Sequence, residues 1–507
     1  MRVATFALWA TLGIASSTGG ALLLPAPAAH GQAPTPWRAD PAGADPVQAQ
    51  SHFVDGKTLL LDGRLGHDSV ARDRSSGTAE TFVLATVTGA DLQAGDRIAP
   101  PPVHLAIVID RSGSMEGVKM RNAVAAAVGA VERMHDGDRA TIIAFESTAR
   151  VLVPPTTLDA STRPSVEAAV RAMRAGGETC ISCALDVATA TLDSVPGPRD
   201  EVKRILLISD GEATSGVRDV RGLRALAARS RDRGFAVSTI GVDLAFDEKV
   251  MAAIAQESNG RHFFVPDPST LEQVFEQELG TLETAVATDA DLAIDAAPGV
   301  VVEDVLDRSF RREAGRVRVP LGAFDARQEK TVLVKVRVPA DSDGTQPVVR
   351  LALAYRDVVR HDDGRCSGDL ALDVRDDGSA QRELDPFVAA RVERNRTTRT
   401  LTEANDLFEH GKAAEAQALL ARRQSDLSKA KATALPAATA MPAPSKAFAR
   451  PVDRDFGEQT EALAQAQSGF ASTPSASGVP GGPPPQASPA ARSAVRNNQA
   501  HATDLGL

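Results

Sequence analysis

The sequence predicts an α/β protein with a doubly wound, mostly parallel sheet, flanked by a β-sandwich, a short helical hairpin and a disordered tail. Three observations support this prediction. Apolar strands alternate with amphipathic helices over about residues 100–286. Alternation of single apolar and polar residues, typical of a β-sandwich, replaces that pattern over 287–378. Ala, Pro, Ser, Gly and Gln dominate over 431–507, as in "SASGVPGGPPPQASPAARS", a composition that does not bury a core.

Length and charge limit the kind of protein. A chain of 507 residues is too long for one ordinary core, so several domains are expected. It carries 56 Lys and Arg against 66 Asp and Glu, a formal net charge of −10, and the basic residues are scattered. Phosphate binding needs a clustered basic surface, so nucleic acid is not an expected partner.

The first residues resemble an export signal. "MRVATFALWATLGIASSTGGALLLPAPAAHGQA" has one arginine, an apolar stretch and small residues at "APA", which predicts a signal peptide over 1–28 with cleavage near Ala28. An uncleaved membrane anchor is the alternative, because the apolar stretch nearly reaches spanning length. A Pro/Ala/Gln-rich linker follows over 29–52. With no membrane span expected after signal removal, we expect an extracytoplasmic protein, either periplasmic, on the cell surface or secreted.

The α/β segment begins with "HLAIVI" (104–109), a buried-strand pattern, followed by the Ala-rich helix "VKMRNAVAAAVGAVERM". "ATIIAF" is predicted as a strand, with "ARVLVP" as its hairpin partner. "VKRILLIS" (202–209) is the fourth strand, and "FAVSTIGV" and "RHFFVP" continue the series with helices between them. This order predicts βαβ units in one sheet, closed by the helix in "STLEQVFEQELGTLETAV".

Two further segments surround this domain. Strands are predicted over 53–99, and if they join the sandwich of 287–378, the α/β domain of 100–286 is an insertion in it. Residues 383–430 include "LTEANDLFEHGKAAEAQALLARR", which predicts a single helical hairpin.

The candidate site begins at "VIDRSGSMEG" (108–117), where a strand runs into oxygen-bearing side chains. Asp110, Ser112 and Ser114 alternate by two, so their oxygens can turn toward one point, with no basic partner beside them. Asp210 ends the fourth strand. In a sheet of order 3-2-1-4-5-6, the first and fourth strands are neighbours where the strand order reverses. Both aspartates are therefore expected in one crevice that invites a cation.

A third segment, "AGGETC", fits the same place. Gly176 and Gly177 permit a close approach of the backbone. Thr179 then offers a hydroxyl just before a predicted helix.

These residues together resemble the von Willebrand factor type A domain. D-x-S-x-S at 110–114, the Gly-flanked Thr179 and Asp210 in "SDG" are similar to the family's metal-ion-dependent adhesion site, and the likeness covers about 100–286. The resemblance is with bacterial secreted members of the family.

The resemblance implies a role for each residue. Ser112 and Ser114 would bind the metal through their hydroxyls, Thr179 directly or through water, and Asp110 and Asp210 largely through water. The metal would be Mg²⁺, with Mn²⁺ or Ca²⁺ as alternatives, since hard cations prefer oxygen ligands. A partner protein would complete the site with a carboxylate.

Two more carboxylates lie close in the sequence. Glu178 stands where many family members carry glycine, so an effect on metal affinity stays open. Glu212 is interpreted as a surface or capping residue.

Three cysteines are present, too few for a disulfide scaffold. The spacing of Cys180 and Cys183 permits a disulfide in an oxidising compartment, and a reactive thiol pair at a helix start is the alternative. Cys366, in the polar stretch "HDDGRCSGD", is interpreted as a loop residue with a free thiol or an intermolecular link.

The predicted function is a divalent-cation-dependent protein-binding or adhesion module. The alternative is a structural protein of envelope assembly, in which the metal only stabilises the fold. An enzyme is not expected. "VIDRSGS" is superficially similar to haloacid-dehalogenase phosphatases, but Ser112 stands where those enzymes need a second aspartate, and neither a G-x-S-x-G elbow nor a P-loop occurs.

Overall fold

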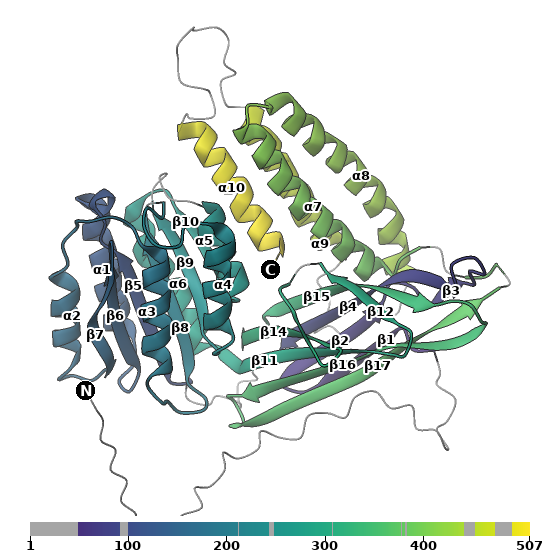
Figure 1. The fold of residues 1–507 in the computed structure, drawn as a ribbon, viewed down its shortest axis with the longest axis horizontal. Coiled ribbons are helices and arrows are strands. Elements are labelled where there is room, and N and C mark those ends of the chain that lie inside the picture. Colours follow the sequence, from purple (N-terminus) through teal and green to yellow (C-terminus); the bar gives the residue numbers. More distant parts are fainter. Residues whose placement is uncertain are drawn as a thin grey trace, which may run out of the picture.

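The computed structural model forms an α/β domain, a β-sandwich and a group of long helices (Figure 1). It describes residues 49–506 except 92–99, 211, 243–247, 307, 377, 381–382, 441–451 and 472–488. The predicted signal peptide and nearly all of the predicted linker lie outside the described residues. Among the helices of the described segments, none combines the length and apolar character needed to cross a bilayer.

The α/β domain has a six-stranded sheet of order β10-β9-β8-β5-β6-β7. Its strands are β5 (Val103–Asp110), β6 (Arg139–Phe145), β7 (Ala149–Thr157), β8 (Val202–Ser209), β9 (Ala236–Val242) and β10 (His262–Val265). All neighbours are parallel except β6 and β7, which form the predicted antiparallel hairpin. In chain order this is 3-2-1-4-5-6, so the predicted doubly wound sheet is confirmed.

Helices cover both faces of this sheet, because the central strands are apolar on both sides. The domain contains α1 (Val118–Arg133), α2 (Arg163–Arg171), α3 (Ile181–Asp193), α4 (Val220–Arg231), α5 (Glu248–Glu257) and α6 (Leu271–Glu283), with short 3₁₀ helices η1 (Gly113–Met115) and η2 (Pro268–Thr270). On β5, Leu105, Ile107 and Ile109 pack with α1, α2 and α6. The alternate residues Ala106 and Val108 pack with α3, α4 and α5.

The β-sandwich consists of two sheets, of order β1-β2-β4-β15-β12 and β13-β14-β11-β16-β17-β3. Its strands are β1 (His52–Gly56), β2 (Leu59–Leu65), β3 (Ser69–Ala71), β4 (Thr78–Gly89), β11 (Ala285–Ala296), β12 (Val301–Val305), β13 (Arg311–Glu313), β14 (Arg316–Asp325), β15 (Glu329–Pro339), β16 (Gly344–Asp357) and β17 (Asp362–Arg375). β4, which precedes the α/β domain, pairs with β15, which follows it. The α/β domain is therefore inserted into the sandwich.

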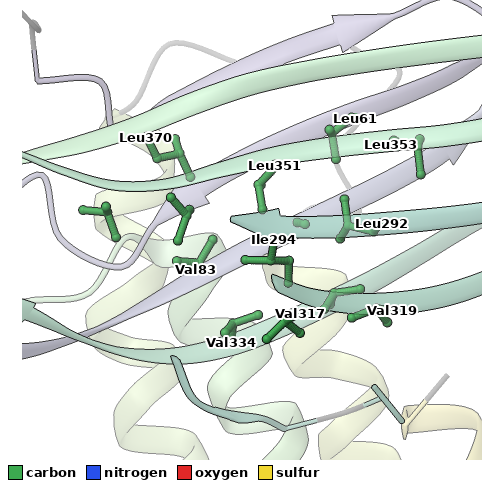
Figure 2. Packing of buried hydrophobic residues seen from close by; sticks show 14 of the residues in the cluster. Leu61, Val83, Leu292, Ile294, Val317, Val319, Val334, Leu351, Leu353 and Leu370 are labelled. Carbon is green, nitrogen blue, oxygen red and sulfur yellow. The ribbon is translucent and has the colours of Figure 1, made fainter. Parts of the chain in front are cut away.

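Figure 2 shows how the two sheets meet. Leu61, Val83 and Val334 come from one sheet, and Ile294 and Leu351 from the other. All five side chains are fully buried. Alternate apolar residues thus form the core between the sheets, as the period-two pattern predicts.

The last part of the chain differs from the prediction. α7 (Pro386–Glu409) and α8 (Ala413–Ala440) form the predicted hairpin, but α8 continues ten residues beyond it. α9 (Val452–Ala471) and α10 (Pro489–Gly506) pack beside them (Figure 1). The prediction of a disordered tail over 431–507 is therefore wrong for the described helices, while the Pro/Gly-rich stretch of 472–488 lies outside the described residues.

The prediction of a disordered tail relied on composition and overlooked the spacing of the apolar residues in α9. Phe456, Leu463 and Phe470 recur every seven residues and face the apolar side of α7. The rings of Phe408 and Phe470 stack with centroids 4.1 Å apart. Alanine and glutamine are good helix formers, so an Ala/Gln-rich segment needs only this narrow apolar stripe to pack.

A buried lysine joins the two sheets of the sandwich. Lys330 is the second residue of β15 and donates from Nζ to the carbonyls of Leu321 (2.8 Å) and Ala323 (2.7 Å) in β14. Burial, together with the nearby Arg308 guanidinium, lowers the pKa of the Lys330 ammonium to about 7. The folded protein thus binds this proton less tightly than the unfolded chain.

We predict that Lys330→Met removes part of the pH dependence of stability. Between about pH 7 and 10 the unfolded wild-type chain carries the Lys330 proton and the folded chain has lost it. The free energy of unfolding gains up to about 1.4 kcal/mol per pH unit from this group as the pH rises. Urea denaturation of both proteins from pH 6 to 10 measures the difference, which should grow above pH 7. Parallel curves would contradict the prediction.

Candidate metal centre

The candidate site lies at the carboxyl ends of the two central strands. Asp110 is the last residue of β5, and Asp210 directly follows β8. The strands are adjacent, with Ile109 opposite Ile208 in the register. The chain leaves β5 toward α1 on one face and leaves β8 toward α4 on the other. This is the point at which the strand order reverses, where open α/β sheets bind ligands.

Hydrogen bonds link four of the five predicted ligand residues. Asp110 Oδ1 accepts from the Ser112 backbone N–H at 2.8 Å. The Ser112 and Ser114 hydroxyl oxygens are 3.0 Å apart, and Ser114 Oγ donates to Asp210 Oδ1 at 2.7 Å. Two segments 96 residues apart in the sequence therefore meet in one polar network.

Ser209 is a member of this network that the sequence analysis missed. Its hydroxyl donates to Asp110 Oδ2 at 2.5 Å. Its signal in the sequence is its place directly after the apolar run Ile205–Ile208 and directly before Asp210.

A lysine also occupies the site. Lys119 Nζ donates to Asp210 Oδ2 at 2.6 Å, and the Asp210 side chain has no exposed surface. The expectation of no basic partner is therefore wrong. Lys119 is the second residue of α1, and the first turn of this helix places its side chain over the site. Arg111, the other basic residue near the motif, instead binds Glu146 Oε1 at 3.0 Å.

The Thr179 segment lies against both of the other loops. Gly176 N–H donates to Arg111 O at 2.6 Å, and Gly113 N–H donates to Gly177 O at 3.1 Å. Gly177 has φ of +95°, and a Cβ there would lie 2.1 Å from Glu146 Oε2, so glycine is needed. These contacts fix the Gly-Gly turn beside the Asp110 loop.

Thr179 itself is held by the segment that follows Asp210. Its N–H donates to Thr214 Oγ1 at 2.9 Å, and its carbonyl accepts from the N–H of Thr214 at 2.9 Å and of Ser215 at 3.2 Å. These bonds all involve the backbone of Thr179, whose side chain is buried. Thr214 is a second residue that the sequence analysis missed, and its only signal is its place four residues after Asp210.

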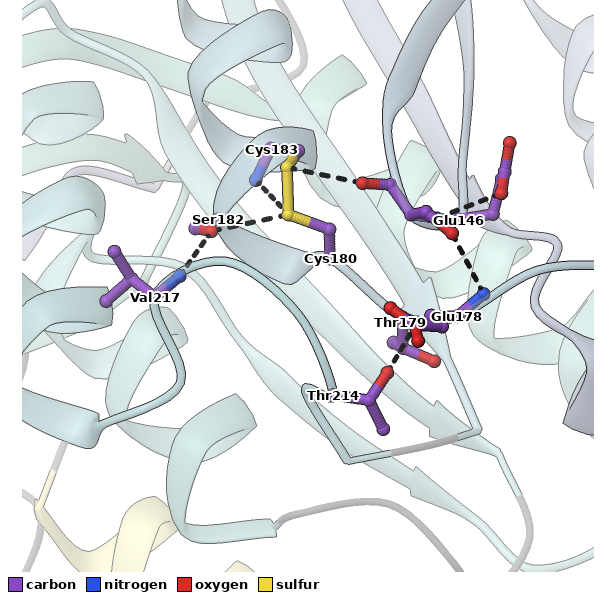
Figure 3. Close-up of a disulfide and its surroundings, with 9 residues drawn as sticks. Glu146, Glu178, Thr179, Cys180, Ser182, Cys183, Thr214 and Val217 are labelled. Carbon is purple, nitrogen blue, oxygen red and sulfur yellow. Dashed lines mark hydrogen bonds between the residues drawn. A yellow bond between two sulfur atoms is a disulfide. The ribbon is translucent and has the colours of Figure 1, made fainter.

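A disulfide between Cys180 and Cys183 follows Thr179 directly (Figure 3). It spans the first turn of α3, and Ser182 in that turn accepts from Val217 N–H at 2.9 Å. The disulfide therefore lies where the Thr179 loop, the start of α3 and the segment after Asp210 meet.

The remaining predicted residues lie as follows. Glu178 is exposed, and its N–H donates to Ser147 Oγ at 3.2 Å. Glu212 is also exposed. Cys366 is not in a loop: it is buried in β17, and burial raises the pKa of its thiol to about 12. The pattern "DDGRCSGD" misled because its polar residues alternate along a strand that pairs with β16.

The donor set suits a hard cation. Burial raises the pKa of the Asp110 carboxyl to about 6, although the hydrogen bonds from Ser209 and Ser112 act to lower it. A cation close to this carboxyl would favour its charged form. In the part of the chain that the structure describes, no group of three or more His, Cys, Asp or Glu side chains is placed to hold a metal. A metal at this site therefore depends on the serine and threonine hydroxyls, an all-oxygen set of the kind that Mg²⁺ accepts.

Comparison with known proteins defines the class. Residues 104–277 match the sequence profile of the von Willebrand factor type A domain. The chain is 24% identical over 350 residues to the uncharacterized protein sll0103 of Synechocystis sp., covering 67% of this chain and 79% of that one. It is 30% identical over 228 residues to a UPF0353 protein of Mycobacterium ulcerans, covering 40% and 68%. The chain belongs to the proteins with a von Willebrand factor type A domain.

One further relative and two solved structures are similar to different lengths of this chain. Escherichia coli YfbK is 26% identical over 224 residues, which cover 43% of this chain and 38% of that protein. A von Willebrand factor type A structure from Catenulispora acidiphila aligns with a TM-score of 0.61 at 19% identity, over 82% of this chain and 98% of that one. The ArnB paralog VWA2 of Sulfolobus acidocaldarius aligns with a TM-score of 0.54 at 17% identity, over 80% and 98%. The fold shared with these structures thus extends beyond the α/β domain.

We predict that Lys119→Met destabilises the protein when divalent cations are chelated. The variant leaves the buried Asp210 carboxylate without its ammonium partner, a change that costs about 3 kcal/mol or more. Thermal unfolding in EDTA should show a clearly lower Tm than wild type, and Mg²⁺ should raise the Tm of the variant more than that of wild type.

Lys249→Met is the matched control. Lys249 is likewise the second residue of a helix, but its partners Asp406 and Glu409 are exposed. Its loss should cost less than about 1 kcal/mol. An equal loss of Tm in the two variants would show that the Lys119–Asp210 pair stabilises the fold no more than an exposed ion pair does.

Proposed function

We propose that the chain is an extracytoplasmic protein-binding module whose α/β domain holds one divalent cation at a metal-ion-dependent adhesion site. The observation that carries this proposal is the network from Asp110 through Ser112 and Ser114 to Asp210, at the reversal point of the strand order. The export-signal pattern over 1–28 and the Cys180–Cys183 disulfide support a location outside the cytoplasm.

The neutral and the charged ligand residues would have different roles toward the cation. Ser112 and Ser114 would hold the cation through neutral hydroxyls, with Thr179 beside them directly or through water. Asp110 and Asp210 would balance its charge, largely through water. Mg²⁺ is the expected ion, with Mn²⁺ or Ca²⁺ as alternatives.

The arrangement favours binding over catalysis. Neutral ligands leave a bound divalent cation strongly electrophilic, and a carboxylate of a partner protein would fill a position otherwise taken by water. Ser114 is exposed while Asp110 and Asp210 are buried, so the site is open from the Ser114 side. The proposed ligand is thus an acidic side chain on a protein, and we propose no chemical transformation of it.

A second candidate function is structural. Because both carboxylates are fully buried, a cation would stabilise the fold whether or not a partner binds. The protein would then serve envelope assembly through its sandwich and helices, with the metal as a folding element only.

We predict that the purified chain binds Mg²⁺ or Mn²⁺ in titration calorimetry. Asp110→Ala and Ser112→Ala should each weaken binding at least tenfold, because one removes a balancing charge and the other a direct ligand. Asp186→Ala is the control, since Asp186 lies on α3 in an exposed pair with Arg229. Retained affinity in both site variants, with circular dichroism unchanged, would exclude the site.

A partner assay separates the two candidate functions. We predict that an immobilised peptide with one central glutamate binds the chain in Mg²⁺, does not bind in EDTA, and loses binding when the glutamate is replaced by glutamine. If Mg²⁺ raises the Tm but no carboxylate-bearing peptide from a varied set binds, the structural function is the better account.

A further inference from the structure

A second polar site lies where the three parts of the protein meet. A cavity of about 210 Å³ is bounded by α4 and α5 of the α/β domain, by the sandwich near Arg308 and Pro320, and by α7 with the end of α10. It lies away from the carboxyl ends of β5 and β8, so it is independent of the proposed metal site.

The lining of this cavity is strongly basic. Among the residues that the structure describes, Glu257 is the acidic side chain of the lining, and carboxylates outside the lining pair with Arg231 and Arg394. Six of the lining residues are arginines: Arg224, Arg231, Arg308, Arg391, Arg394 and Arg399. Although the net charge of the chain is −10, six guanidinium groups therefore line this one small cavity.

Glu257 is already engaged by its neighbours. Its Oε1 accepts from Arg231 Nη1 at 2.5 Å, and its Oε2 accepts from Ser309 Oγ at 2.7 Å. Arg224 Nε lies 3.6 Å from the same Oε2. Arg231 also pairs with Asp232 at 3.1 Å, so Glu257 and Asp232 together balance Arg231, while Arg224 keeps the longer contact with Glu257.

Contacts behind the cavity wall hold Arg308, Arg391 and Arg394 in place. Arg308 Nε donates to the Thr331 carbonyl at 3.1 Å, and Arg391 donates to the Thr331 hydroxyl. Arg394 donates to the Leu505 carbonyl at 2.8 Å, to Asp455 Oδ1 at 2.6 Å and to Glu458 Oε2 at 2.9 Å. Guanidinium groups fixed in this way lose little freedom when an anion binds.

We propose that this cavity binds a small oxyanion of the phosphate class, either free phosphate or the phosphate group of a small ester. Planar guanidinium groups match the oxygens of a phosphate, each with two parallel N–H donors. An anion offsets the mutual repulsion of the arginines. Because the lining comes from all three parts, the bound anion also ties the α/β domain to the sandwich and the helices, and stabilises the folded chain by mass action.

The test is titration calorimetry and thermal unfolding of the whole chain with inorganic phosphate, in EDTA and at constant ionic strength made up with NaCl. EDTA removes any metal, so phosphate at the proposed metal site does not contribute. Wild type should bind phosphate and gain Tm with its concentration. A parallel titration with glycerol 2-phosphate distinguishes the two sources: tighter binding of the ester indicates a phosphorylated small molecule, and tighter binding of inorganic phosphate indicates the free ion.

Arg399→Ala and Arg224→Ala are the site variants, because both side chains are partly or fully exposed and their loss leaves the core intact. Each should weaken phosphate binding at least fivefold. Arg396→Ala is the matched control, since Arg396 is on the same helix, outside the cavity lining and paired with Glu393, and it should leave the affinity unchanged. If all three variants weakened phosphate binding equally, general surface charge rather than this cavity would account for the binding, and the proposal would be wrong. Absence of phosphate binding by wild type would also overturn it.

Discussion

The parallel pairing of β5 with β8 is the constraint on which the rest of the candidate site depends. It sets Ile109 opposite Ile208, and so brings the next residues of both strands, Asp110 and Asp210, to the same edge of the sheet. The chain reaches α1 on one face and α4 on the other. Apolar residues on both faces of β5 maintain this pairing, because either face would be exposed if the strand moved to the edge of the sheet.

Buried negative charge is the second feature that shapes the site. Asp110 and Asp210 have no exposed surface. Asp110 accepts from the Ser209 hydroxyl and the Ser112 N–H, and Asp210 accepts from the Ser114 hydroxyl. Hydrogen bonds alone leave two carboxylates close together in a poorly solvated place, and Lys119 supplies the positive charge. A divalent cation at the proposed site would have the same electrostatic role toward Asp210 as Lys119, and would thus link metal affinity to the position of the first turn of α1.

The insertion of the α/β domain into the sandwich gives that domain neighbours on its far side. β4 and β15 pair across the insertion, and α6 leads directly into β11. Helix α10 packs on α5, while α7 packs on β4 and β15 (Figure 1). The Arg-lined cavity is a product of this arrangement, since its walls exist only when all three parts are in place.

The sequence by itself determined the fold class and the identity of the site loops. Apolar runs such as "HLAIVI", separated by amphipathic helices, specify a parallel sheet by burial alone, and the alternation of Asp110, Ser112 and Ser114 is a local property of the chain. What the sequence did not reveal depends on contacts between distant segments. Lys119 and Thr214 enter the site only through the directions of α1 and of the segment after Asp210, and Cys366 is buried because β17 pairs with β16. The helices α9 and α10 are stabilised by packing on α7 rather than by their own composition, because an Ala/Gln-rich segment with a narrow apolar stripe orders only against a partner.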